Sequence, residues 1–253
     1  MGLAVGLAVA AVAVPRPAAA LALIRDAEIE HTLARMAHPL LRAAGLSPQT
    51  VRIYIVNDRD ANAFVAGGQN IFINTGLMTE LGSMDELRAV IAHEIGHITG
   101  GHLARRGTGV AAGGMMAIGA LGALGAAVAG VPEAGIAIAT GTAQVAHRSA
   151  LAYSRADEAS ADQAGLRYLA AAGADPQAMI EVLEHFRGQD ALLAAGHVDP
   201  YALSHPMWGE RLALIEDRVA KLPPGGPPSA EDAYWHARMV AKLDAFLGSP
   251  AQT

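Results

Sequence analysis

The sequence predicts an α+β protein that is mainly helical and contains a small β-sheet of about three strands. Of its 253 residues, 52% are apolar, which is ample for a buried core. Aromatic residues make up only 4%, whereas alanine and glycine are abundant, a composition that suits closely packed helices better than an all-β sandwich. Short segments rich in β-branched residues lie between residues 51 and 73, among several longer segments with helical periodicity.

The charge and the absence of cysteine exclude several classes of function. The formal net charge of -6 is spread along the chain, and the sequence contains no stripe of basic residues interleaved with aromatics. Nucleic acid is therefore not an expected partner. Because the sequence has no cysteine, neither disulfide bonds nor a thiolate metal site can form. Any metal must be bound by histidine and carboxylate side chains.

The amino terminus has the character of a secretory signal peptide. Residues 1–14 form an unbroken run of small and apolar residues, and Ala18, Ala19 and Ala20 fit an A-x-A cleavage site. We therefore expect residues 1–20 to be a signal peptide and the protein to be periplasmic or otherwise in the cell envelope. A membrane anchor and a disordered tail are the alternative interpretations.

The first predicted elements are one helix and a small sheet. Apolar residues recur at helical spacing among charged ones over residues 21–44, which predicts an amphipathic helix. A turn is expected at Gly67 and Gly68. Three segments have the β-branched character of strands: residues 51–56, 63–65 and 71–73.

The next predicted helix has a marked start. Ser83 and Glu86 match the capping box S-x-x-E, and the helical pattern that follows runs from residue 87 to residue 106. A second helical pattern, rich in acidic and basic residues, runs from residue 149 to residue 172. Three further helices are predicted at residues 176–187, 206–221 and 230–247.

These elements suggest one main domain over residues 21–221. Residues 222–229 are rich in proline and glycine and are interpreted as a linker. The last segment, residues 230–253, begins with a predicted helix and can be interpreted as the start of a further helical-repeat module.

Residues 109–146 form an almost uncharged segment rich in alanine and glycine. Its first half is long enough to span a bilayer, but alanine and glycine offer little apolar surface for insertion. We expect a helical hairpin that packs over the core or the active site. Shallow, peripheral contact with a membrane is the alternative.

The strongest chemical signal is the motif H-E-x-x-H at residues 93–97. Residues four apart on a helix lie about 40° apart around its axis, so the rings of His93 and His97 converge on one point that suits zinc. Glu94 is turned about 100° away, where it can reach a water molecule as general base rather than bind the metal. The alternative is a solvated helix face, but the neighbouring residues are largely apolar.

A catalytic zinc ion needs a third protein ligand and an open position. His102 is a poor candidate, because on a continuing helix it would lie about 140° around from His97 and face away from the metal. Glu158 is the better candidate, since Glu158 and Asp162 share one face of the second helix. One carboxylate can bind zinc while the other accepts the ring N–H of a ligating histidine. An ordinary charged helix face is the alternative.

Over about residues 21–220, the sequence resembles the gluzincin metallopeptidases of family forty-eight. This family includes proteases of the HtpX, BepA and CAAX prenyl types, and the likeness is greatest to the BepA-like periplasmic zinc metalloproteases. The motifs that carry the resemblance are Asn62-Ala63-Phe64, Asn74-Thr75-Gly76-Leu77, His93-Glu94-Ile95-Gly96-His97 with Gly100-Gly101-His102, residues 154–162, and Ser204-His205-Pro206 with Arg211.

The resemblance implies a zincin-like metalloprotease domain in which the small sheet packs on the zinc-binding helix. It implies one Zn²⁺ ion bound by His93, His97 and Glu158, with Glu94 as general base and Asp162 as a supporting partner of the ligands. The expected activity is that of a metalloendopeptidase whose substrates are polypeptides, namely misfolded or unassembled proteins of the cell envelope.

Further residues take roles from the same resemblance. His205 would lie near the open zinc position, where it would steady the transition state or plug the resting site, and Arg211 would support its loop. The alternative for His205 is a turn residue before a proline. An extended substrate would add itself to the sheet at the strand that contains Asn62, Ala63 and Phe64.

Two other functions compete with this one. The first is a chaperone-like or assembly-assisting protein that binds peptides while His205 keeps the zinc site closed. The second is an integral-membrane protease that spans the bilayer through its segment rich in alanine and glycine.

Overall fold

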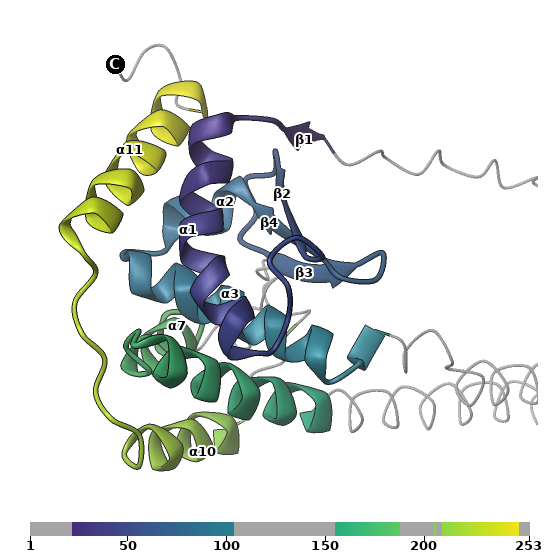
Figure 1. The fold of residues 1–253 in the computed structure, drawn as a ribbon, viewed down its shortest axis with the longest axis vertical. Helices are drawn as coiled ribbons and strands as arrows, with labels where there is room; N and C mark the ends of the chain where they lie inside the picture. Colours follow the sequence, from purple (N-terminus) through teal and green to yellow (C-terminus); the bar gives the residue numbers. More distant parts are fainter. Residues whose placement is uncertain (1–21, 104–154, 188–204, 206–208, 248–253) are drawn as a thin grey trace, which may run out of the picture.

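The computed structural model describes residues 22–103, 155–187, 205 and 209–247 (Figure 1). The predicted signal peptide and the predicted hairpin at residues 109–146 lie outside these residues. The described helices and strands, in chain order, are β1 Leu23–Ile24, α1 Ala27–Ala43, β2 Arg52–Val56, β3 Ala63–Ala66, β4 Asn70–Asn74, α2 Thr75–Glu80, α3 Met84–Thr99, a helix over residues 155–172, α7 Gln177–His185, α10 Gly209–Val219 and α11 Ala230–Leu247.

The α+β fold is confirmed: helices predominate, and the strands form one small sheet in the order β1-β2-β4-β3. β2 and β4 are parallel, whereas β3 and β4 form an antiparallel hairpin with its turn at Gly67 and Gly68, as predicted. Both glycines have positive φ angles, 57° and 96°, which glycine adopts without steric cost. In this order β3 lies at an edge of the sheet.

The two faces of the sheet differ in chemistry. Alternate residues of the central strands, such as Ile55 and Ile73, are buried in the core. On the opposite face, the rings of Tyr54, Phe72 and Phe64 stack across three strands with centroids 5.1 Å apart. These cross-strand aromatic pairs fix the register of the sheet.

The prediction of about three strands missed β1. Residues 23 and 24, which the helical pattern had included, pair instead with the end of β2. The helix begins later because the side chain of Asp26 accepts hydrogen bonds from the backbone N–H groups of Glu28 and Ile29. Aspartate at this position satisfies the first free donors of a helix, so it ends the strand and starts α1.

Helix α3 lies at the centre of the molecule, between α1 and the sheet on one side and α7 on the other (Figure 1). Its start agrees with the predicted capping box, since the Ser83 hydroxyl accepts the backbone N–H of Glu86. Almost every residue of α3 up to His97 is buried. The motif histidines and Glu94 are therefore placed in the interior rather than on a solvated face.

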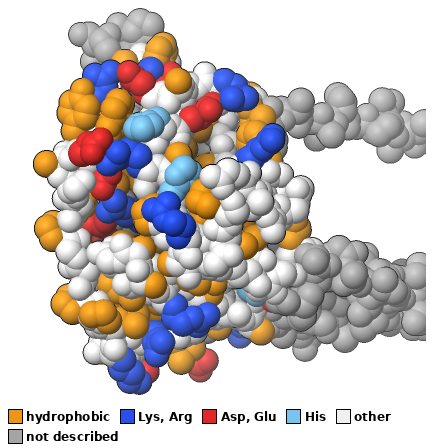
Figure 2. Space-filling model, viewed as in Figure 1, with side chains coloured by type: hydrophobic (Ala, Val, Ile, Leu, Met, Phe, Trp, Pro, Cys, Tyr) orange, Lys and Arg blue, Asp and Glu red, His pale blue; other side chains and the backbone are white. Residues whose placement is uncertain are grey.

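Helix α11 folds back along α1, near the amino-terminal end of the described chain (Figure 1). Ion pairs join the two helices, among them Arg35 with Asp232 at 2.8 Å and Lys242 with Asp26 at 2.7 Å. Figure 2 shows acidic and basic side chains interspersed over this face. These pairs are partly buried, and α11 also buries Met239 and Leu243, so both the ion pairs and the apolar contacts attach this helix.

Helix α2 was not predicted, because its six residues are too few to show a helical period. It follows β4 without a loop and contacts α11. None of the helices in the described part of the chain combines the length and apolar character needed to cross a bilayer.

Candidate metal centre

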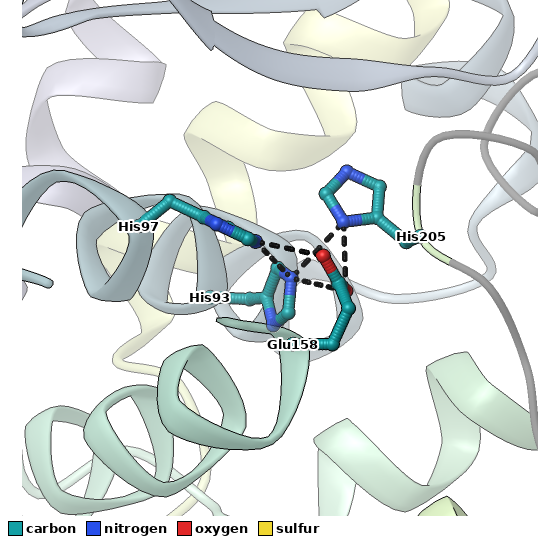
Figure 3. Close-up of side chains that lie close together, drawn as sticks. All are labelled: His93, His97, Glu158 and His205. Atoms are coloured by element: carbon teal, nitrogen blue, oxygen red, sulfur yellow. Dashed lines mark hydrogen bonds and ion pairs between the residues drawn. The ribbon is translucent and has the colours of Figure 1, made fainter. Parts of the chain in front are cut away.

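Four buried side chains meet at one point: two come from α3, one comes from the 155–172 helix, and the fourth is His205 (Figure 3). They are His93, His97, Glu158 and His205, and their potential ligand atoms all lie within 4.8 Å of one another. The Nε2 atoms of His93 and His97 are 2.9 Å apart, and each lies 3.2 Å from an oxygen of Glu158. The arrangement thus brings together the three side chains proposed as zinc ligands from the sequence.

Two glycines allow the 155–172 helix to approach α3 this closely. A Cβ atom at Gly96 would lie 2.6 Å from the carbonyl oxygen of Ala161, and one at Gly165 would lie 3.1 Å from the backbone nitrogen of His93. Both distances are too short for an unstrained contact. The backbones therefore touch directly, which brings Glu158 within reach of both motif histidines.

We expect Gly96→Ala to separate these helices and to damage both stability and metal binding. Inserting a methyl group into a tight contact typically costs about 1–3 kcal/mol. Urea unfolding and a zinc titration measure the two effects. Gly82→Ala is the matched control, since its Cβ would meet only the flexible Glu86 carboxylate at 3.4 Å. If Gly96→Ala unfolded and bound zinc as the parent does, the close approach of the backbones would not be needed.

Asp162 and Arg211 contact the proposed ligands His93 and Glu158 and hold them in place. The Asp162 carboxylate accepts the Nδ1–H of His93 at 2.8 Å, which leaves the His93 Nε2 lone pair directed at the metal group. Arg211 donates to both oxygens of Asp162, lies 3.2 Å from Oε2 of Glu158, and donates to the backbone carbonyl of His205 at 3.2 Å. It therefore contacts both carboxylates and the backbone of His205 at the same time.

The electrostatics of the cluster favour a cation. Burial raises the pKa of Glu158 and of Asp162, but the charges and hydrogen bonds of His205, His93 and Arg211 outweigh it and leave both values low. Burial likewise opposes protonation of His93, yet its bonds with the two carboxylates raise its pKa to about 10. A buried imidazole with such a pKa marks a place where positive charge is strongly stabilised.

The donor set fits a divalent ion. The described residues of the cluster include three buried carboxylates, those of Glu94, Glu158 and Asp162, and a single guanidinium, that of Arg211, which pairs with Glu158 and Asp162. With neutral histidines, two negative charges remain uncompensated. Imidazole and carboxylate groups are the ligands that zinc accepts in the absence of cysteine.

Glu94 lies beside this group but outside it. Its side chain is fully buried, and within the described residues neither of its oxygens accepts a hydrogen bond. Oε1 lies 3.3 Å from Nε2 of His205. A small cavity of about 50 Å³ adjoins Glu94 and is lined also by His97, Phe64 and His205. A buried carboxylate beside a cavity is placed to accept a proton from a small molecule held there.

His205 connects the metal group with the edge strand. Its Nε2 lies 3.1 Å from the carbonyl oxygen of Ala63 and can donate a hydrogen to it; in a neutral ring, Nδ1 would then carry the lone pair. That Nδ1 lies 3.0 Å from Oε2 of Glu158 and 3.1 Å from Nε2 of His93. Ala63 is fully buried, and His205 contacts its backbone carbonyl.

The other two residues predicted to bind substrate, Asn62 and Phe64, are not among the potential metal ligands. Phe64 is half-buried and lines the small cavity, whereas Asn62 precedes β3 and does not line it. A larger cavity of about 300 Å³ lies between α1 and β2, and its described lining includes none of the predicted site residues.

Reasoning from the sequence missed the position of His102. The prediction assumed a helix that continues to residue 106, but α3 ends at Thr99, and Gly101 has a φ angle of +64°. His102 is not in the metal group, as expected, but its Nδ1 lies 2.8 Å from Nδ1 of His97. The adjacent glycines Gly100 and Gly101 were a usable signal, because glycine commonly ends helices.

Comparison with known proteins supports the chemistry of this cluster. The sequence profile of Peptidase family M48 matches residues 24–219. The beta-barrel assembly-enhancing protease of Escherichia coli K12 is 30% identical over 213 residues, which cover 84% of this chain and 43% of the relative. That of Yersinia pestis is 29% identical over 218 residues, which cover 86% and 44%. Metalloprotease LoiP of Escherichia coli K12 is 27% identical over 199 residues, 77% of this chain and 72% of that protein.

The lengths of these proteins differ. The chain spans about half or less of the length of the beta-barrel assembly-enhancing proteases that it matches.

Proposed function

The chain belongs to peptidase family M48, and from this we propose that it is a zinc-dependent metalloendopeptidase. Its substrates would be misfolded or unassembled proteins of the cell envelope. The observation that carries the proposal is the buried meeting of His93, His97 and Glu158 beside Glu94, a carboxylate whose oxygens accept no hydrogen bond from the described residues. The three ligands could hold a metal ion, and Glu94 could act as a base beside the same cavity.

We assign the chemical roles as follows. His93, His97 and Glu158 hold the ion, and Asp162 keeps the proton of His93 on Nδ1. A bound zinc ion supplies Lewis acidity, which lowers the pKa of water and polarises the scissile carbonyl. Glu94 takes a proton from the attacking water and delivers it to the leaving amine. Burial around Glu94 excludes competing water, which strengthens these electrostatic interactions.

The edge position of β3 supports binding of extended polypeptides. An extended chain can add itself to a free sheet edge through backbone hydrogen bonds, and those bonds are largely independent of side-chain identity. The carbonyl of Ala63, which His205 contacts, marks the end of this edge nearest the metal group. Such a mode of binding favours unfolded or loosely packed segments.

The cell-envelope assignment rests on two supports. Residues 1–20 have the pattern of a signal peptide. The name of the Escherichia coli relative associates that protein with the assembly of β-barrels. We extend this setting to the chain as a proposal and place its polypeptide substrates in the periplasm.

A second function is favoured by the position of His205. Its Nδ1 lone pair completes a four-residue group around the metal position, which leaves less room for water and substrate. A protein in this state would bind polypeptides and assist their assembly without cleaving them.

Casein hydrolysis by the zinc-loaded full chain and by His205→Ala tests the two functions. If His205 closes the site, the substitution should free the position for water and substrate and raise the rate of cleavage by about tenfold or more, equivalent to about 1.4 kcal/mol in the barrier. A chelator should stop cleavage, and added zinc should restore it. The matched control is His185→Ala on α7, which pairs with Glu80. Absence of cleavage in both zinc-loaded forms would reject the peptidase and favour the binding protein.

A further inference from the structure

His102 occupies a buried position directly behind one of the two motif histidines. Its Nδ1 lies 2.8 Å from Nδ1 of His97, and the two rings meet edge to face with centroids 4.8 Å apart. The other nitrogen of His97, Nε2, points toward His93 and Glu158 (Figure 3). The ring of His97 is therefore held between the metal group on one side and His102 on the other.

The backbone after α3 is shaped to place this ring. The helix ends at Thr99, and Gly101 adopts a left-handed conformation with φ of +64°. At Gly100, a Cβ atom would collide with the imidazole of His102. These two glycines together let His102 fold back over the end of α3, where it is only 1% exposed.

The surroundings of His102 favour one distribution of hydrogens on its ring. Its Nε2 lies 3.6 Å from Oδ1 of Asp157, which is also buried, and the negative carboxylate favours a hydrogen on that nitrogen. In a neutral imidazole this leaves Nδ1 as an acceptor. The Nδ1 of His97 must then be the donor, and its Nε2 keeps the lone pair that a metal ion requires.

We propose that His102, backed by Asp157, is a positioning residue that fixes the tautomer and ring orientation of His97 for metal binding. The inference rests on the proposed function, because it concerns the same metal centre. It gives each motif histidine a support of its own: Asp162 bonds to His93 directly, whereas His97 contacts a second imidazole that has the Asp157 carboxylate 3.6 Å from its other nitrogen.

Two substitutions separate this role from simple packing. His102→Leu fills a similar volume but offers no acceptor, whereas His102→Asn places an amide oxygen where Nδ1 lies. We expect His102→Leu to weaken zinc affinity by about 10- to 100-fold, the usual effect of losing such a partner, and His102→Asn to restore most of it. His185→Leu, at a histidine paired with Glu80 on the surface, is the matched control.

The measurements are zinc affinity by chelator competition and nitrogen-15 NMR of the histidine rings, both on the full chain. The wild type should show the hydrogen of His97 on Nδ1, protected from exchange, and His102→Leu should lose that protection. If His102→Leu bound zinc like the wild type, or if its loss were not rescued by His102→Asn in a folded protein, the inference would be wrong. A wild type that binds no zinc would overturn the proposed function as well.

Discussion

Replacement of Glu94 by glutamine should abolish most peptide hydrolysis while zinc stays bound. The amide keeps the shape of the carboxylate but cannot accept the proton of the attacking water, and a positioned base typically contributes about 100- to 10,000-fold to the rate. Glu94 lies outside the group of potential ligands, so the metal should not depend on it. The rate of casein cleavage and the zinc content of the dialysed protein provide the two measurements.

Glu86→Gln is the matched control for this experiment, because Glu86 lies on the same helix and is also largely buried. It should cleave casein at the parental rate. The proposed mechanism would be rejected by parental activity in a zinc-loaded Glu94→Gln protein. Loss of zinc from that variant would instead show that Glu94 contributes to the metal site itself.

Replacement of Glu158 by alanine should release the metal. This residue faces both motif histidines, and no described residue offers a second carboxylate to the same group. We expect the loss of zinc affinity to exceed about 100-fold, which is the upper end of the usual effect for residues that only support a ligand. The loss is measured as the zinc content of the variant and of the parent after dialysis against a weak chelator.

Glu158→Gln addresses the concern that alanine disturbs folding, since glutamine keeps the volume of the buried side chain. It should also lose zinc, because a neutral amide is a weaker ligand than a carboxylate. Glu184→Ala, an exposed acidic residue on α7, should retain the metal. Full retention of zinc by both Glu158 variants would refute the ligand assignment.

Local periodicity was sufficient to predict the part of the candidate metal centre that lies on α3. The spacing of His93 and His97 on one helix brings their rings together whatever the rest of the fold does. Their burial next to Glu94 followed from the apolar residues around them. The start of α3 could also be predicted, because Ser83 and Glu86 are adjacent in the chain and act locally.

The position of Glu158 in the candidate metal centre depends on contacts between residues that are far apart in the sequence. Glu158 was proposed from its pairing with Asp162 and from a family resemblance, but its approach to His93 requires the backbone contact at Gly96 and Gly165. No periodic pattern encodes a helix crossing of this kind. The same limit explains β1, whose two residues form a strand only because β2 lies beside them.

The contact between His102 and His97 was missed because the predicted helix was too long: it ran to residue 106, whereas α3 ends at Thr99. An unbroken helix places this residue away from His97, whereas a left-handed glycine at 101 brings the two rings into contact. The end of a helix is set by one or two residues, so periodicity over a longer window does not locate it.

Arg211 contacts Asp162 and His205 through separate atoms. Its Nε and one terminal nitrogen bind Asp162, while its other terminal nitrogen alone contacts the carbonyl of His205. Displacement of His205 would break that last bond and leave the two bonds to Asp162 intact. The position of His205 can therefore change while Arg211 keeps its hold on Asp162, the carboxylate that orients the ring of His93.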